Sequence, residues 1–323
     1  MRAVVVERPG PPEVLELVER PLPEIRPGWV LVQVKAFGLN RSEMFTRQGH
    51  SPGVEFPRVL GIECVGMVAD PGDSGIRADT TVAALMGGMG RAYDGGYAEY
   101  ALLPAERLMR LDTELDWATL GALPETFLTA AGSLETLALR AGQRLLIRAA
   151  TSSVGAAALA LGAARGLEVA ATTRDKTKVS WLRERGALHV ILDRGELVSE
   201  LRAVWPDGAD GVIDLVGGPA LIDTVRTAAR GGTVCNTGIL GGTWIIKEFE
   251  PLEDIPSGVK LTTFGSSTIV PAEGGRALQR IADDVAAGRF DANVDRVFTL
   301  DEIVDAHRYM EANHATGKLV VTT

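Results

Sequence analysis

One short turn, rich in hydroxyl side chains, has residue types and spacing that could bind a phosphate. It reads Ala149-Ala150-Thr151-Ser152-Ser153-Val154-Gly155, between an apolar segment at 144–150 and an Ala-rich segment at 154–165. A strand that passes through a tight turn into a helix presents the amides of the helix N-terminus to a phosphate. Gly155 keeps the last glycine of the G-x-G-x-x-G fingerprint, whereas Ala150 and Ser152 stand at the first two positions. The turn predicts a dinucleotide pyrophosphate site formed by Thr151, Ser152, Ser153 and Val154, and the alternative is a tight turn that binds no nucleotide.

The next segment predicts which nicotinamide cofactor is bound. At the end of the expected second strand the sequence reads Thr172-Thr173-Arg174-Asp175-Lys176-Thr177-Lys178. An acidic residue near this point would bind a free ribose 2′-hydroxyl, and cations would bind a 2′-phosphate. Thr173, Arg174 and Lys178 therefore favour NADPH over NADH. Two alternatives stay open, because Asp175 is either a ribose ligand or a helix N-cap, and the lysines could lie on a solvated helix face.

The segments around this turn alternate between strands and helices. Apolar strands are expected over 144–150, 167–173, 189–192, 211–216 and 233–237, with helices over 154–165, 176–185, 197–205 and 220–229 between them. Near-continuous apolar strands separated by helices predict a doubly wound parallel sheet, an α/β architecture. The first 110 residues instead show short β-rich runs with Pro, Gly and Asp turns, which predict a mostly β domain. We expect one domain at 122–267, and a second at 1–121 that is completed by 268–323.

Composition limits the class of function. A chain of 323 residues has room for about two domains. The net charge of −9, without a long basic stretch, argues against a nucleic-acid or acidic-membrane partner. Cys64 and Cys235, the two cysteines, stand far apart among apolar neighbours, which fits the reducing cytoplasm. The most apolar long stretch, 145–173, contains Arg148, Arg165 and Glu168, so no membrane span is expected. The first nine residues become charged and proline-broken before an apolar region develops, so no signal peptide is expected either.

Five motifs in order resemble one family. They are the β-rich start, Gly61-Ile62-Glu63-Cys64-Val65-Gly66-Met67-Val68, Gly95-Gly96-Tyr97-Ala98-Glu99-Tyr100, the nucleotide turn and Gly317-Lys318-Leu319-Val320. Together they resemble the medium-chain dehydrogenase/reductase superfamily along essentially the whole chain. The resemblance implies a GroES-like, mostly β catalytic domain and a Rossmann domain that binds the cofactor.

The resemblance also directs attention to the metal ligands of the zinc alcohol dehydrogenases in this superfamily. Ile62 stands where their zinc-binding histidine would be, and Asn40 stands in the place of a cysteine ligand. Neither residue is a usual zinc ligand, so we expect no metal site. The branch that works without zinc is similar to NADPH:quinone oxidoreductases, in which an asparagine corresponding to Asn40 lies beside nicotinamide and substrate. Asn40 offers both a donor and an acceptor, and the alternative is that it caps the helix or turn over 41–47.

Further site residues follow from the resemblance alone. Family positions close to the cofactor correspond to Thr129, Gly238, Ile239, Leu240, Ser266 and Lys318. Arg194 stands where relatives often place a tyrosine that covers the adenosine. The family usually dimerises through its nucleotide domain, so we expect a homodimer, with the apolar strand that follows Thr243–Ile246 as a candidate edge.

Three functions are compatible with these residues. The first is hydride transfer from NADPH to a quinone or related conjugated carbonyl, an enone included. The second is an NADPH-dependent 2-enoyl thioester or enone reductase, although 43–50 lacks the tyrosine acid of such relatives and offers only His50. The third is an NADPH-binding structural or sensor protein without turnover.

Overall fold

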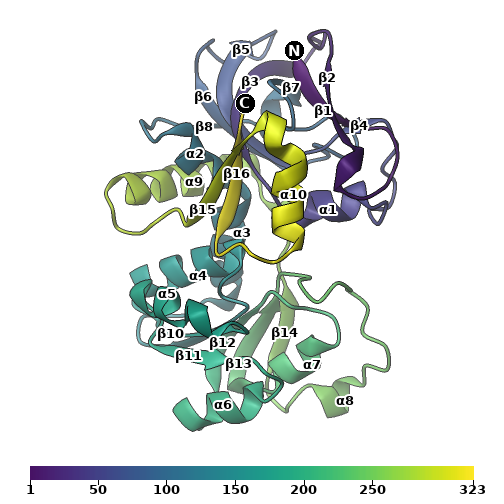
Figure 1. The fold of residues 1–323 in the computed structure, drawn as a ribbon. Helices are drawn as coiled ribbons and strands as arrows, with labels where there is room; N and C mark the ends of the chain where they lie inside the picture. The colour runs from purple at the N-terminus through teal and green to yellow at the C-terminus, as the bar shows by residue number, and fades with distance from the viewer. The chain divides into compact units, whose positions relative to one another are not determined.

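The computed structural model describes all residues, Met1–Thr323, and divides into two units (Figure 1). Unit 1 consists of Met1–Leu128 and Ile269–Thr323, and unit 2 of Thr129–Thr268. The boundary lies within helix α3 (Pro124–Leu137), whereas the sequence placed it just before this helix, at 121 and 122. The chain therefore leaves unit 1, forms unit 2 without interruption and returns.

Unit 2 contains one sheet of six strands in the order β11-β10-β9-β12-β13-β14, and each strand is parallel to its neighbours. The strands are β9 (Arg144–Arg148), β10 (Glu168–Thr173), β11 (His189–Leu192), β12 (Ala209–Asp214), β13 (Ala228–Asn236) and β14 (Lys260–Thr263). The helices are α4 (Ser153–Ala164), α5 (Val179–Glu184), α6 (Leu197–Val204), α7 (Ala220–Val225) and α8 (Pro251–Asp254), with short 3₁₀ turns η3 (Lys176–Lys178) and η4 (Ser266–Thr268). The strand order changes direction between β9 and β12, which is where doubly wound sheets bind their ligands.

Alternating side chains of β9 face opposite sides of this sheet. Leu145 lies against Gly162 of α4. Leu146 belongs instead to a core with Leu197 of α6 and Leu221 of α7. Because both faces are covered, the strand is apolar without alternation, which confirms the predicted parallel architecture.

Unit 1 is mostly β and is completed by the end of the chain. Its larger sheet has the order β15-β16-β3-β5-β6-β8, with β7 also paired to β3, and a smaller sheet has the order β2-β1-β4. The strands are β1 (Arg2–Val6), β2 (Leu15–Glu19), β3 (Trp29–Gly38), β4 (Arg58–Val59), β5 (Glu63–Asp70), β6 (Thr81–Leu85), β7 (Tyr100–Pro104), β8 (Met109–Arg110), β15 (Val294–Thr299) and β16 (Lys318–Thr322). The helices are α1 (Arg41–Arg47), α2 (Trp117–Gly121), α9 (Pro271–Ala286) and α10 (Ile303–Glu311). The last strand, β16, lies between β15 and β3.

A buried polar cluster ties α1 to α10. Arg47 is fully buried and donates from Nη1 to Nδ1 of His307 at 3.1 Å. Because arginine has no acceptor, His307 accepts through Nδ1 and carries its proton on Nε2, which lies 3.1 Å from the Tyr97 hydroxyl. Burial, followed by the Arg47 charge, lowers the pKa of His307 to about 3.

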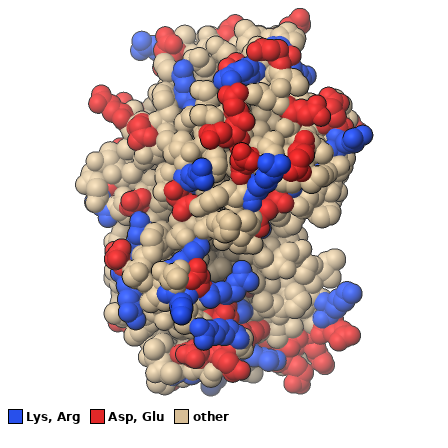
Figure 2. All heavy atoms as spheres, in the orientation of Figure 1, with Lys and Arg blue, Asp and Glu red and all other residues tan.

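Charges are interspersed over the face of the molecule drawn in Figure 2, where Lys and Arg alternate with Asp and Glu on both units. None of the helices is both long and apolar enough to cross a membrane.

Candidate functional site

The turn between β9 and α4 holds one residue in a conformation that favours glycine. Ala149 has φ +65°, the left-handed region, and its N–H donates to Oγ1 of Thr172 at 2.9 Å. The sequence comparison assigned the first glycine position of the fingerprint to Ala150. The left-handed backbone therefore lies at Ala149, one residue before the position that the spacing from Gly155 gives to the first glycine.

Ser152 and Gly155 fix the start of α4. The Ser152 hydroxyl accepts from Gly155 N at 3.2 Å and donates to the Ala149 carbonyl at 2.8 Å, so Ser152 is the N-cap. A Cβ on Gly155 would lie 2.5 Å from the Ala149 oxygen. The first-turn amides of a helix have no partner within it, and the cap satisfies that of Gly155. The amides of Ser153 and Val154 are thus not used by the helix, and these residues and Thr151 are all partly exposed, which fits a bound pyrophosphate.

The end of β10 presents Arg174 to solvent. Thr173 is 3% exposed, and its hydroxyl accepts from Asp175 N at 3.1 Å. The Asp175 carboxylate accepts from Thr177 N at 2.9 Å and from the Thr177 hydroxyl at 2.7 Å, which lowers its pKa. Asp175 therefore acts as the N-cap of η3 through Oδ1, while Arg174 is exposed and Lys178 partly exposed.

The predicted cofactor residues after β13 and β14 follow neighbouring strands at the same edge of the sheet. Gly238 packs so closely that a Cβ would lie 2.5 Å from the Leu215 oxygen. Leu240 N donates to the same oxygen at 3.0 Å, with Ile239 between them. Ser266, 8% exposed, follows β14. Thr129, 5% exposed, lies on α3, and its carbonyl accepts from the Ser133 hydroxyl, which is 2.9 Å from the hydroxyl of Thr237, the residue before Gly238.

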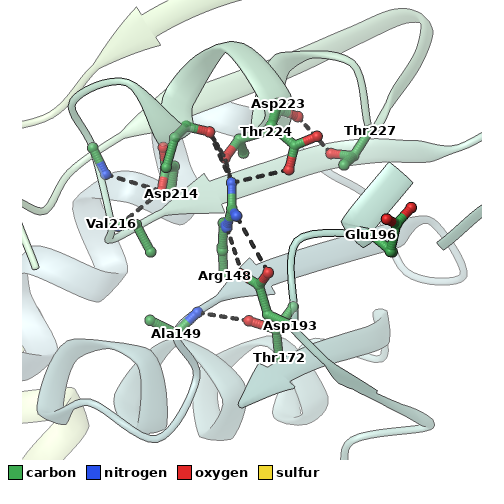
Figure 3. A network of polar contacts seen from close by, with 12 residues as sticks. Arg148, Ala149, Thr172, Asp193, Glu196, Asp214, Val216, Asp223, Thr224 and Thr227 are labelled. Carbon is green, nitrogen blue, oxygen red and sulfur yellow. Dashed lines mark hydrogen bonds and ion pairs between the residues drawn. The ribbon is translucent and has the colours of Figure 1, made fainter. Parts of the chain in front are cut away.

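The residue that organises this edge was missed at the level of sequence. Arg148, the last residue of β9, is only 6% exposed, and its guanidinium pairs with the Asp193 carboxylate at 2.8 Å (Figure 3). It also donates to Oγ1 of Thr224 at 2.7 Å. Arg194, the residue predicted at the adenosine end, is exposed beside Asp193. The sequence signal that could have indicated Arg148 is a charged residue at the end of an otherwise apolar strand.

In unit 1, Asn40 is held by a buried ion pair. Lys318 and Glu63 have fully buried side chains and pair at 2.7 Å. Lys318 Nζ donates to Asn40 Oδ1 at 2.6 Å, and Asn40 Nδ2 donates to Glu63 Oε1 at 2.9 Å. Asn40 also stands at the N-cap position of α1, as the alternative expected, where its backbone carbonyl accepts from Glu43 N at 3.1 Å and its side chain makes no capping hydrogen bond. Its amide orientation is thereby set, with the oxygen toward Lys318.

Glu43 lies next to this cluster. Its Oε1 accepts from Ile62 N at 3.0 Å and from Asn40 Nδ2 at 3.4 Å. Burial is the main cause that raises the pKa of Glu43 to about 7. Ile62, in the place of a histidine ligand, is 3% exposed, and no group of three or more His, Cys, Asp or Glu side chains is arranged to hold a metal.

Two family models match the chain. The alcohol dehydrogenase GroES-like domain matches residues 26–113, and a zinc-binding dehydrogenase domain matches residues 185–321. The quinone oxidoreductase YhfP of Bacillus subtilis, whose assignment is provisional, is 27% identical over 90% of this chain and 89% of its own length. Human quinone oxidoreductase is 27% identical over 99% of this chain and 97% of its own length. The crystal structure of Escherichia coli quinone oxidoreductase complexed with NADPH has a TM-score of 0.89 at 22% identity, with both chains fully covered, and shows the same fold.

A parallel-sheet unit with a nucleotide turn and a GroES-like β unit in one chain are typical of a nicotinamide-dependent oxidoreductase of two domains. The chain thus carries the two domains typical of the medium-chain dehydrogenase/reductase superfamily, and relatives named quinone oxidoreductases align over nine tenths or more of it.

Proposed function

We propose that this protein is a zinc-independent oxidoreductase that transfers hydride from NADPH to a quinone or related conjugated carbonyl. The observation that carries the proposal is Asn40, an amide oriented by Lys318 and Glu63 where zinc-dependent relatives have a metal ligand. Relatives named quinone oxidoreductases align over nearly the whole chain, which supports the same reaction class.

Unit 2 contains the residues that would hold the cofactor. The amides of Ser153 and Val154, with Thr151, would bind the pyrophosphate, and Arg174 and Lys178 the 2′-phosphate. When bound, NADPH supplies the hydride. Gly238, Ile239 and Leu240 offer backbone groups, and Ser266 and Thr129 offer hydroxyls, for the nicotinamide half.

Asn40 is proposed to act as an acceptor. Its nitrogen already donates to Glu63, and its oxygen accepts from Lys318. A carbonyl oxygen has a second lone pair, so Asn40 can still accept a hydrogen bond from an N–H or O–H. Reduction of a quinone is favoured by aromatisation of the product, so the protein's main tasks are alignment and exclusion of water.

The reaction is tested by following NADPH consumption with a panel of quinones, small enones and a 2-enoyl thioester. Quinone turnover above that of the thioester supports the proposal. A much higher thioester rate would assign the protein to the enoyl reductases instead. NADPH binding without turnover of any acceptor would indicate a sensor.

Cofactor preference is tested with Arg174→Ala. Loss of a charge-assisted contact to the 2′-phosphate should weaken NADPH binding by roughly tenfold or more and leave NADH nearly unchanged. Arg183→Ala, an exposed arginine on α5, is the matched control. Equal losses for NADPH and NADH would contradict this assignment of Arg174.

We further propose a homodimer that works in the cytoplasm. The outer strand β14 offers an unpaired edge for a second copy, and the two free cysteines are buried, as suits a reducing compartment. Sedimentation equilibrium should give twice the chain mass, and Thr262→Pro should shift the measured mass toward that of the monomer.

A further inference from the structure

The buried guanidinium of Arg148 lies at the carboxyl edge of the unit 2 sheet, on the side of α6 and α7 (Figure 3). Arg148 lies two residues after Leu146, which packs in the core beneath those helices, so both side chains face the same way. β9, which ends at Arg148, borders the point where the strand order reverses. This polar side chain therefore lies where doubly wound sheets bind ligands.

Arg148 joins two segments that follow different strands. Its Nε and Nη2 donate to the Asp193 carboxylate at 2.8 and 3.4 Å, just after β11. Its Nη1 donates to the Ala220 carbonyl at 2.8 Å and to Thr224 Oγ1 at 2.7 Å, both on α7. The side chains of Arg148 and Asp193 are 7% and 13% exposed. Water screens such a pair little, so the two charges are strongly coupled.

Asp193 is a neighbour of the segment that selects the cofactor. Its N–H donates to the Thr173 carbonyl at 2.9 Å, and the next residue after Thr173 is Arg174. A carboxylate at this strand end opposes binding of a phosphate ester, which carries nearly two negative charges at neutral pH. Asp223 adds a further acidic group 3.5 Å from Arg148. Arg148 is the cation that compensates these acids.

We propose that Arg148 is a positioning residue for cofactor selection: it neutralises Asp193 and turns it inward, so that the end of β10 accepts a 2′-phosphate. The inference rests on the proposed NADPH-dependent function. In this proposal Arg148 does not itself bind the phosphate, but it affects the choice between NADPH and NADH.

The experiment measures dissociation constants of NADPH, NADH and 2′,5′-ADP by calorimetry on the full chain. Arg148→Met should weaken NADPH and 2′,5′-ADP by roughly tenfold and NADH by no more than about threefold, because Asp193 is left uncompensated. Adding Asp193→Asn to Arg148→Met should recover most of the NADPH affinity. Arg148→Lys, which keeps the charge, should keep the ratio of NADPH to NADH affinity.

If Arg148→Met folds poorly, the single variant Asp193→Asn tests the same inference through its affinity for NADPH. It should leave NADPH binding as tight as in the parent or tighter, since one negative charge is removed. Arg144→Met is the matched control, because Arg144 forms a similar pair with Asp210 at the opposite end of β9. Parallel losses for NADPH and NADH in every variant, without recovery in the double variant, would overturn the inference and leave the proposed function standing. A parent chain that binds neither nucleotide would overturn both.

Discussion

At the scale of single residues, the pair of Lys318 and Glu63 places two opposite charges where neither side chain reaches solvent. Removal of one partner leaves a buried charge uncompensated, which typically costs about 3–5 kcal/mol, whereas removal of both costs much less. Lys318→Met should therefore lower the free energy of unfolding by about that amount, and adding Glu63→Gln should recover part of it. Urea denaturation measures both, with the exposed Lys260→Met as the control. An unchanged midpoint in Lys318→Met would contradict the burial of this pair.

His307 and Glu43 should give the stability two opposing dependences on pH. The pKa of His307 is lowered to about 3 in the folded chain, so the unfolded chain binds the proton near pH 6 and stability is lost as pH falls. The pKa of Glu43 is raised from 4.5 to about 7, so the folded chain binds the proton and stability is lost as pH rises toward 7. Each slope is at most about 1.4 kcal/mol per pH unit, and the two slopes oppose each other between about pH 4.5 and 6.5.

Variants separate the two slopes. In His307→Gln the unfolding free energy should fall as the pH rises from about 5.5 to 7, because Glu43 acts alone. In Glu43→Gln it should rise over the same interval, because His307 acts alone. Denaturant titrations at several pH values measure the slopes. If both variants kept the parent's pH profile, these two groups would not be the ones that titrate.

At the scale of elements, the turn into α4 carries a strained alanine and a glycine that cannot be replaced. Ala149→Gly should raise the unfolding free energy by roughly 1 kcal/mol, because glycine adopts a φ of +65° without steric cost. Gly155→Ala should lower it, since the added Cβ would meet the Ala149 oxygen at 2.5 Å. Gly265→Ala is the control, because its Cβ would have nothing nearer than 3.7 Å. Thermal denaturation ranks the three variants, and a destabilised Ala149→Gly would contradict the left-handed turn.

The same turn shows what the sequence could predict. Apolar strands that alternate with helices predicted the parallel sheet correctly, because burial of both faces of a strand leaves a continuous apolar run. The helix expected at 220–229 ends at Val225, since Ala228 joins β13 and pairs with Ala209. Local alanine content favours a helix there, and pairing with a neighbouring strand outweighs it. Tertiary contacts, which no local pattern contains, decide such boundaries.

The site residues also divide into those that a local sequence pattern indicates and those that only tertiary contacts bring together. The turn and Arg174 could be proposed from the sequence because they are contiguous with predicted elements. Arg148 and its partner Asp193 were not, because the chain offers many carboxylates and only the folded sheet brings this one to the end of β9. The pairing of Lys318 with Glu63, which lies in another strand of unit 1, was equally hidden.

At the scale of the whole molecule, the two units differ in how they depend on the chain's end. All strands of the unit 2 sheet lie within Thr129–Thr268, whereas the unit 1 sheet needs β16, which lies between β15 and β3. Deletion of residues 316–323 removes this strand and leaves Glu63 without Lys318. We therefore expect unit 1 to lose its sheet and unit 2 to keep its own, along with its binding of 2′,5′-ADP. Hydrogen exchange measured by mass spectrometry should show loss of protection in β3 and retention in β12. Equal loss of protection in β3 and β12 would show instead that the two units unfold as one cooperative system. In that case the unit 2 sheet would have no stability of its own, although all its strands are contiguous in the chain.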